Sequence, residues 1–158
     1  MQHGSALEPL FLELGPAGTD RGAQLCDDLA DAGQPVQYLG PDRLRFACRP
    51  VALRRALANL IDNAVKYGGV AEVGLQADRD TIRLTIEDRG AGIPAAAREQ
   101  VFQPFFRLEP SRSRATGGTG LGLAVARTIV HRHGGEITLD DRPGGGLAVR
   151  VILPVAGP

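Results

Sequence analysis

The clearest apolar pattern in the chain recurs every three to four residues and begins at Pro50. It predicts one helix that ends at Tyr67-Gly68-Gly69, with Pro50 suited to the first turn. A second segment at helical spacing, 121–133, ends at Gly134-Gly135. A weaker one, 20–32, is closed by Gly33 and then Pro35. The apolar residues on one side of the first helix are Leu53, Leu57, Leu60, Ile61 and Ala64.

Shorter alternating runs predict strands that are joined in part by hairpins. The runs 71–76 and 81–87 flank Ala77-Asp78-Arg79-Asp80, and two more, 136–140 and 147–153, flank Pro143-Gly144-Gly145-Gly146. Helices and strands in this order indicate an α/β fold, a two-layer sandwich in which helices cover one face of a mixed sheet. Weaker strand patterns occupy 9–14, 36–39 and 44–47.

The segment 94–118 has a different character from its surroundings. After Ile93-Pro94 we expect a short alanine-rich helix, and from Phe102 to Gly118 no clear period follows. Long irregular segments inside a compact domain are usually lids or disorder. We therefore expect a lid within 94–118.

Composition fits one ordinary domain. The chain has 158 residues, of which 43% are hydrophobic and 23% charged, with 18 basic and 18 acidic side chains. This balance gives no support for nucleic-acid binding. We assign residues 6–158 to a single domain, whereas Met1 to Ser5 resembles a cloning remnant or a disordered end, so His3 is given no role.

Cysteines and apolar runs bear on the compartment. Cys26 and Cys48 have neither metal-ligand spacing nor a paired framework, which favours a reducing cytoplasmic setting. No apolar run approaches the roughly 18 residues of a membrane span, and the first residues lack the pattern of a signal peptide. We expect the chain as given to be soluble.

A glycine-rich loop opens the second predicted helix. Exposed backbone N–H groups and the helix dipole favour phosphate at such a place, and Gly118, Gly120 and Gly122 supply the room. A dinucleotide fingerprint would need a third glycine at Leu123 and a strand leading into the loop. A P-loop would need a lysine after the last glycine, but the chain's one lysine is Lys66, in the other helix. The pattern therefore predicts a phosphate site of another type.

Polar residues line one face of the first helix. Asn59, Asn63, Lys66 and Tyr67 are spaced i, i+4, i+7 and i+8, beside the apolar face. An asparagine oxygen can coordinate Mg²⁺ together with phosphate oxygens. A merely solvated helix face would give the same pattern.

An acidic residue stands at the end of the strand 81–87. Asp88 is followed by Gly90 and Gly92, and its carboxylate could accept a hydrogen bond from the exocyclic amine of adenine. A tight turn, in which Asp88 binds its own backbone, explains the same residues. Spacing alone leaves both interpretations open.

Taken together, four stretches resemble the sequence boxes of the histidine kinase ATP-binding domain. Residues 59–67 look like the N box, 88–92 like the first glycine box, Phe102-Gln103-Pro104-Phe105 like the F box, and 118–123 like the second glycine box. The resemblance covers nearly the whole chain and extends to the superfamily of gyrase, Hsp90 and MutL, which share the Bergerat ATP-binding fold. The F box, with the short junction Tyr67-Gly68-Gly69, resembles osmosensing kinases of the envelope-stress type.

The resemblance implies a nucleotide site for ATP and Mg²⁺. Asn63 would be the Mg²⁺ ligand with Asn59 in support, and Lys66 would face phosphate. Asp88 would accept from the adenine amine. The remaining contacts with the nucleotide would come from Tyr67, Gly90, Gly92, Ile93, Gly118, Thr119, Gly120, Leu121, Gly122 and Leu123.

The resemblance also implies a lid anchored by Phe102 and Phe105, with Arg112 or Arg114 reaching the γ-phosphate as a catalytic group. Arg107 is a third arginine of the lid, and the alignment does not single out one of them. Arg89 stands where many family members have asparagine.

The acceptor of the phosphoryl group is inferred from Asn59. Relatives that hydrolyse ATP or phosphorylate serine have a glutamate there, because water or a hydroxyl must lose a proton to attack. Asparagine is no base, so the resemblance favours transfer to a histidine, whose neutral nitrogen attacks directly. A non-catalytic module in which ATP orders the lid, or a serine kinase of the anti-sigma type, remain the alternatives.

The histidine itself is expected elsewhere. None of His3, His131 and His133 has the His-Glu and Thr-Pro context of the family's phosphoacceptor. We expect His133 to interact with the dipole at its helix C-terminus. The resemblance implies a separate histidine-bearing dimerisation domain, a downstream response regulator and a membrane-anchored full-length protein with this domain in the cytoplasm.

Overall fold

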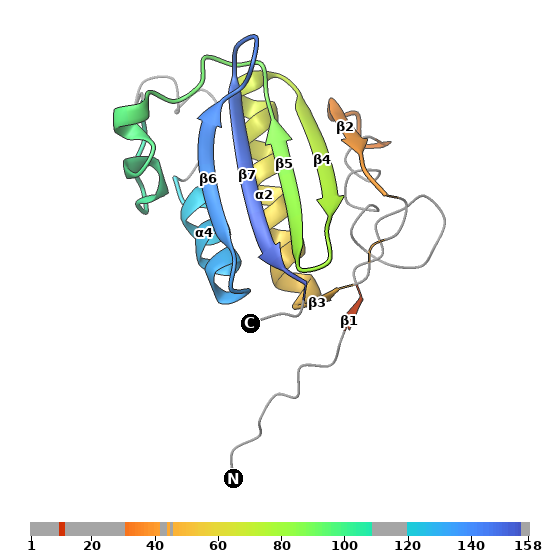
Figure 1. Cartoon of the computed structure of the whole chain (residues 1–158). Helices are drawn as coiled ribbons and strands as arrows, with labels where there is room; N and C mark the ends of the chain where they lie inside the picture. Colours follow the sequence, from red (N-terminus) through yellow and green to blue (C-terminus); the bar gives the residue numbers. More distant parts are fainter. Residues whose placement is uncertain (1–9, 12–30, 42–43, 45, 109–119, 156–158) are drawn as a thin grey trace.

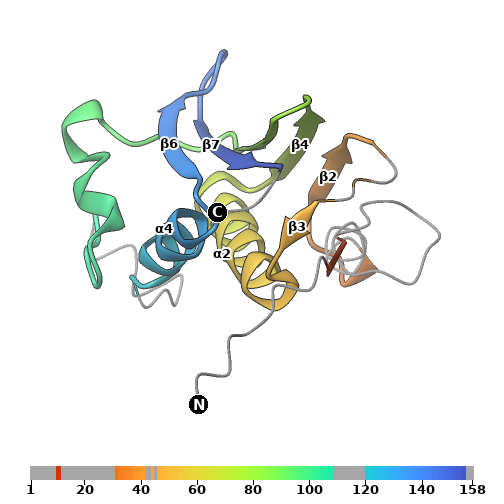
Figure 2. The same cartoon turned by 60° about the horizontal axis from the view of Figure 1, so that its bottom comes forward.

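The computed structural model describes residues 10–11, 31–41, 44, 46–108 and 120–155. Five strands form an open sheet, and α2 (Pro50–Gly68) and α4 (Gly122–Arg132) lie together on one of its faces, as Figures 1 and 2 show from two directions. The predicted two-layer α/β sandwich is confirmed. Among the described residues, no helix combines the length and the apolar character needed to cross a bilayer.

The sheet is mixed, as predicted. Its strand order is β2-β4-β5-β7-β6, with β2 parallel to β4 and every other neighbouring pair antiparallel. A separate two-stranded pair joins β1 to β3. Both predicted hairpins, β4 with β5 and β6 with β7, are confirmed. The strands are β1 Leu10–Phe11, β2 Val36–Leu39, β3 Ala47–Cys48, β4 Ala71–Ala77, β5 Thr81–Glu87, β6 Glu136–Asp141 and β7 Leu147–Pro154.

Helix α2 forms the centre of the core. Pro50 occupies its first turn, and Gly69 ends it with φ 74°, donating its N–H to Val65 O at 3.0 Å. The facing strand β5 buries alternate side chains, Ile82, Leu84 and Ile86. Burying both apolar faces against each other holds the two layers together. The buried residues of α2 are Leu53, Ala56, Leu57, Leu60, Ile61 and Ala64.

The segment after Ile93 differs from the expected helix. It forms two 3₁₀ turns, η1 (Ala95–Ala97) and η2 (Gln100–Phe102), and becomes extended at Gln103. So short a segment cannot sustain an α-helix by itself, and tertiary contacts decide its shape. Phe102 is buried beneath Arg127, whose guanidinium carbon lies 4.8 Å from the ring centroid. The predicted helix at 20–32 falls almost entirely outside the described residues.

His133 lies at the C-terminal end of α4, as expected, and has a second partner outside this helix. Its ring is 4% exposed and accepts a hydrogen bond at Nε2 from the Arg49 N–H at 3.0 Å. Nδ1 lies 2.8 Å from Ile129 O and is therefore the protonated nitrogen that donates. The Nδ1–H therefore interacts with the carbonyl end of α4, where the helix dipole is negative. Through Nε2, His133 also connects the C-terminal end of α4 to the residue that precedes α2.

We expect His133→Ala to lower the free energy of unfolding by about 2–4 kcal/mol, because the change leaves the Arg49 N–H unpaired and opens a cavity between two helices. Chemical denaturation measures the change. The matched control is His131→Ala, since His131 is exposed on the same helix and its loss should cost no more than about 0.5 kcal/mol. Equal losses for the two variants would contradict the connecting role.

Candidate nucleotide-binding site

Asp88 lies at the end of β5 and is 6% exposed. Its Oδ1 accepts hydrogen bonds from the N–H groups of Gly90, at 2.9 Å, and Leu147, at 3.2 Å. The Asp88 N–H in turn donates to Leu147 O at 3.0 Å. The turn predicted as an alternative is therefore present, and it occupies one carboxylate oxygen. Within the described part of the chain no donor pairs with Oδ2, so this oxygen remains for a ligand.

The backbone at the end of α2 and the backbone of the β6–β7 hairpin both lie close to Asp88. A Cβ at Gly68, at the end of α2, would overlap the Asp88 side chain, and one at Gly146 would overlap the Asp88 carbonyl. A Cβ at Gly90 would lie 2.5 Å from Tyr67 O. Three glycines thus allow α2, the loop after β5 and the β6–β7 hairpin to meet around one carboxylate, which fixes its orientation.

The N box and the second glycine box meet in space. Asn59 and Asn63 are half-buried on α2, and Gly122 is the first residue of α4. A Cβ at Gly122 would lie 3.8 Å from the amide nitrogen and the amide oxygen of Asn63, and as far from Asn59 Cβ. The absent side chain leaves the Asn63 amide beside the N-terminus of an 11-residue helix, where free N–H groups favour phosphate.

The other two residues of the helix stripe are more exposed. Lys66 Nζ lies 2.9 Å from Asp62 Oδ2, one turn earlier on α2. This carboxylate therefore neutralises the ammonium group, and a phosphate would have to compete with it. The Tyr67 side chain is 55% exposed, so its ring has a free surface.

A main-chain contact joins Phe105 to Gly120, on either side of residues that belong to the predicted lid. The Phe105 N–H donates to Gly120 O at 3.0 Å, and a Cβ at Gly120, whose φ is 75°, would lie 2.9 Å from Phe105 Cα. Phe102 is buried, as expected for an anchor, but the Phe105 ring is 72% exposed. The described contact of Phe105 with Gly120 is thus made by its backbone, whereas its ring faces solvent.

Several predicted site residues lie outside the described residues. These are Arg112, Arg114, Gly118 and Thr119, so their roles stay predictions. The remaining residues of the second glycine box, Leu121 and Leu123, are half-buried at the start of α4, and Ile93 is half-buried after Gly92.

Sequence reasoning missed the contribution of the β6–β7 hairpin to Asp88. Leu147 lies 59 positions further along the chain, so no local pattern connects the two residues. The run Gly144-Gly145-Gly146 was a signal for a close approach of backbone, but it did not indicate what the hairpin would approach.

The donor set fits Mg²⁺ in the way that nucleotide sites use it. In the part of the chain that the structure describes, no group of three His, Cys, Asp or Glu side chains could hold a metal ion. Mg²⁺ usually keeps several waters and is bound through one or two protein oxygens together with substrate phosphates. A single amide oxygen, that of Asn63 next to a helix N-terminus, suits this arrangement.

Comparison with known proteins gives the family. The sequence profile described as histidine kinase-, DNA gyrase B- and HSP90-like ATPase matches residues 48–157. The chain belongs to this family. Within it, the chain is an ATP-binding catalytic domain of the sensor histidine kinase type. This agrees with the resemblance of its four sequence stretches to the boxes of that domain.

Individual relatives agree with the family. The chain is 42% identical over 122 residues to the sensor histidine kinase GtrS of Pseudomonas aeruginosa, covering 77% of this chain and 25% of GtrS. It is 43% identical over 107 residues to CpxA of Escherichia coli, covering 67% and 23%. The solved histidine kinase domain of the E. coli osmosensor EnvZ is 32% identical, with a TM-score of 0.64, covering 84% of this chain and 83% of that domain. The chain spans about a quarter of the length of the two curated relatives.

Proposed function

We propose that this domain binds ATP with Mg²⁺ and transfers the γ-phosphoryl group to a histidine on a separate dimerisation domain. The observation that carries the proposal is the approach of Gly122 to Asn59 and Asn63, which puts a possible metal ligand beside a phosphate-binding helix end. No other described part of the chain combines these two features.

Three parts of the domain would bind the base, the phosphates and the metal ion of the nucleotide. Oδ2 of Asp88 accepts from the exocyclic amine of adenine, while Oδ1 stays with the backbone. The N-terminus of α4 binds phosphate through its N–H groups. Asn63 supplies one ligand to Mg²⁺, which when bound neutralises phosphate charge. Arg112 or Arg114 of the lid would add positive charge at the γ-phosphoryl group, as phosphoryl transfer requires.

The proposed acceptor is inferred from Asn59. Its amide cannot remove a proton from water or from a serine hydroxyl, so a site built on it favours a nucleophile that needs no base. A neutral histidine nitrogen is such a nucleophile. This argument favours histidine over hydrolysis and over a serine acceptor.

The partners follow from the kinds of protein that resemble the chain. The relatives are named sensor histidine kinases, and the chain spans about a quarter of their length. We therefore propose that the full-length protein carries the histidine-bearing dimerisation domain, is anchored in the membrane with this domain in the cytoplasm, and passes the phosphoryl group to a response regulator.

We expect Asn63→Ala to slow phosphoryl transfer from ATP by roughly 100-fold, because the change removes the proposed metal ligand from the reacting phosphates. The measurement uses labelled ATP, Mg²⁺ and the purified dimerisation domain of the same kinase added in trans, with the label followed on that domain. The control is Arg83→Gln, since Arg83 lies on the open face of the sheet and pairs with Asp78 at 3.3 Å.

The same experiment separates the alternatives. Nucleotide binding without any label on the dimerisation domain would favour the non-catalytic module, in which ATP orders the lid. Label that is stable to acid and appears on serine of an added partner would favour the anti-sigma type. Unchanged transfer by Asn63→Ala would exclude Asn63 as the metal ligand.

A further inference from the structure

The tip of the β6–β7 hairpin is formed largely by glycines. Gly144, Gly145 and Gly146 follow one another with φ values of 88°, 105° and 113°. Glycine loses more conformational freedom on folding than any other residue, and these three bring no side chains to pack. The hairpin is closed by the Arg142 N–H, which donates to Gly146 O at 3.0 Å, and by the Gly145 N–H, which donates to Arg142 O at 3.0 Å.

This hairpin contributes to the orientation of Asp88. Leu147, the first residue after the glycines, donates its N–H to Asp88 Oδ1. Gly146 packs against the Asp88 carbonyl so closely that no side chain would fit. A shift of the hairpin would therefore turn the carboxylate or remove one of the two donors that fix it.

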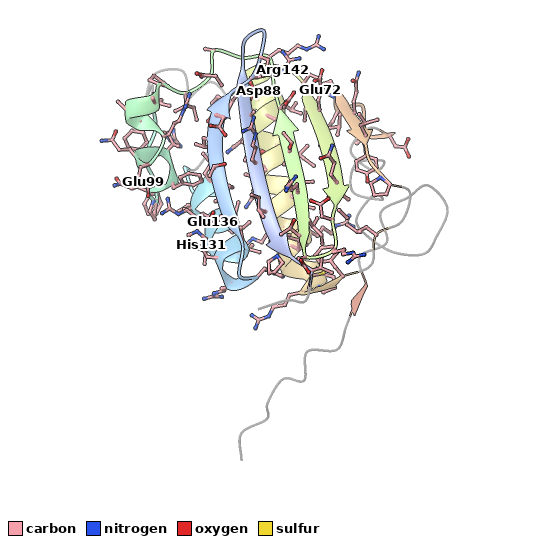
Figure 3. The ribbon with its side chains drawn as sticks, in the orientation of Figure 1. Glu72, Asp88, Glu99, His131, Glu136 and Arg142 are labelled. Atoms are coloured by element: carbon pink, nitrogen blue, oxygen red, sulfur yellow. The ribbon has the colours of Figure 1, made fainter. Side chains whose placement is uncertain are left out.

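The Arg142 side chain is the group that fixes the hairpin. Its Nη1 donates to Gly145 O at 3.2 Å and to Pro143 O at 3.3 Å, both within the hairpin. The rest of the guanidinium makes ionic contacts with two carboxylates of the sheet, with Nε 3.4 Å from Glu87 Oε2 and Nη2 3.6 Å from Glu72 Oε2, although Nε has no hydrogen-bond partner among the described residues. The side chain is only 18% exposed, so water screens these interactions less than at the surface. Figure 3 labels Glu72, Asp88 and Arg142 at the same end of the sheet.

The two carboxylates need this positive charge. Glu72 and Glu87 stand directly opposite each other on β4 and β5, where like charges repel. Arg89 Nη2 also lies 2.6 Å from Glu72 Oε1. Glu87 and Arg89, the residues just before and just after Asp88, thus belong to one cluster of charged side chains together with Glu72 and Arg142.

We infer that Arg142 is a positioning residue for adenine recognition, acting through the glycine hairpin on Asp88. The inference rests on the proposed function, because it takes Asp88 as the acceptor of the adenine amine. It adds a determinant of specificity on the open face of the sheet, opposite to the helices. A planar guanidinium is suited to this role, since it reaches backbone carbonyls and two carboxylates at once.

The test measures the preference for adenine over guanine. Calorimetry with Mg²⁺ gives the dissociation constants of ATP and GTP for the wild type and for Arg142→Gln. We expect the ATP constant to rise by roughly tenfold while the GTP constant changes little, because one well-oriented hydrogen bond is worth about that factor. Arg142→Lys should restore the preference only in part, since an ammonium group cannot span the same partners.

Two further variants make the result decisive. Arg150→Gln is the matched control, because Arg150 lies on the same face, pairs with Asp140 at 3.2 Å and does not contact the hairpin by any described bond. Glu72→Gln leaves Arg142 in place but removes a carboxylate, so it should reduce the preference by roughly threefold. Glu72→Gln supplies the answer if Arg142→Gln does not fold, as judged by thermal melting.

The outcomes separate a failure of the positioning role of Arg142 from a failure of the proposed ATP-binding function. Proportional losses for ATP and GTP in Arg142→Gln, or an unchanged preference in both this variant and Glu72→Gln, would overturn the positioning role. A wild type without preference for ATP would overturn the adenine assignment of Asp88, and the inference with it. Loss of preference in Asp88→Asn but not in the Arg142 and Glu72 variants would leave the proposed function standing and refute the inference alone.

Discussion

Asp88→Ala should weaken ATP binding by roughly ten- to a hundredfold, the size expected for a hydrogen bond to a charged group. The variant should also lose about 1–3 kcal/mol of stability, because the N–H groups of Gly90 and Leu147 lose their shared acceptor in a buried place. Calorimetry with ATP and Mg²⁺ measures the first effect, and chemical denaturation the second.

Asp88→Asn separates the two effects. The amide oxygen of asparagine can still accept from both backbone donors, but its NH₂ group would face the amine of adenine, donor against donor. We therefore expect nearly normal stability together with weak ATP binding. Equal affinity of the wild type and both variants would refute the assignment of the adenine contact, whatever their stabilities.

Among glycine-to-alanine substitutions at the site, Gly146→Ala should lower the stability most. Its Cβ would overlap the Asp88 carbonyl, which is rigid backbone, and would lie 3.0 Å from Arg89 Cα. Since φ is 113°, the new side chain is also strained. We expect the free energy of unfolding to fall by more than about 3 kcal/mol. Thermal melting and denaturant titration provide the measurement.

The neighbouring glycine is the control. Gly145 has a φ of 105°, but a Cβ there would meet nothing within 4 Å. Gly145→Ala therefore introduces the backbone strain without a steric clash of the new Cβ. It should lower the free energy of unfolding by about 1–2 kcal/mol. Similar losses for both alanines would mean that the hairpin moves away from Asp88 at little cost, which would also weaken the positioning role of Arg142.

Periodic features were predictable because they depend on burial of one face. The stripe from Leu53 to Ala64 and the alternation of Ile82, Leu84 and Ile86 were predicted as a helix and a strand, and both bury those residues. Helix ends were predictable too, since Gly69 takes the left-handed conformation that the sequence pattern favours.

Features that depend on distant contacts were not predictable. The turns at 95–102 are short and have no cap, so the packing of Phe102 under Arg127 decides their form. His133 was expected to interact only with its own helix end, but the N–H of Arg49, 84 positions away, also donates a hydrogen bond to its ring. The candidate site was predicted by resemblance, and the approach of Gly122 to the two asparagines requires the packing of α4 on α2.

The bond between the Phe105 N–H and Gly120 O has a consequence for how such domains can diverge. Because residues 105 and 120 are joined to each other, the distance between them does not depend on how many residues separate them. Lengthening a loop between fixed ends costs little, about 0.6 kcal/mol for each doubling. We therefore expect insertions and deletions between residues 105 and 120 to leave Asn63, Gly122 and Asp88 in place, so the length of this segment is free to vary.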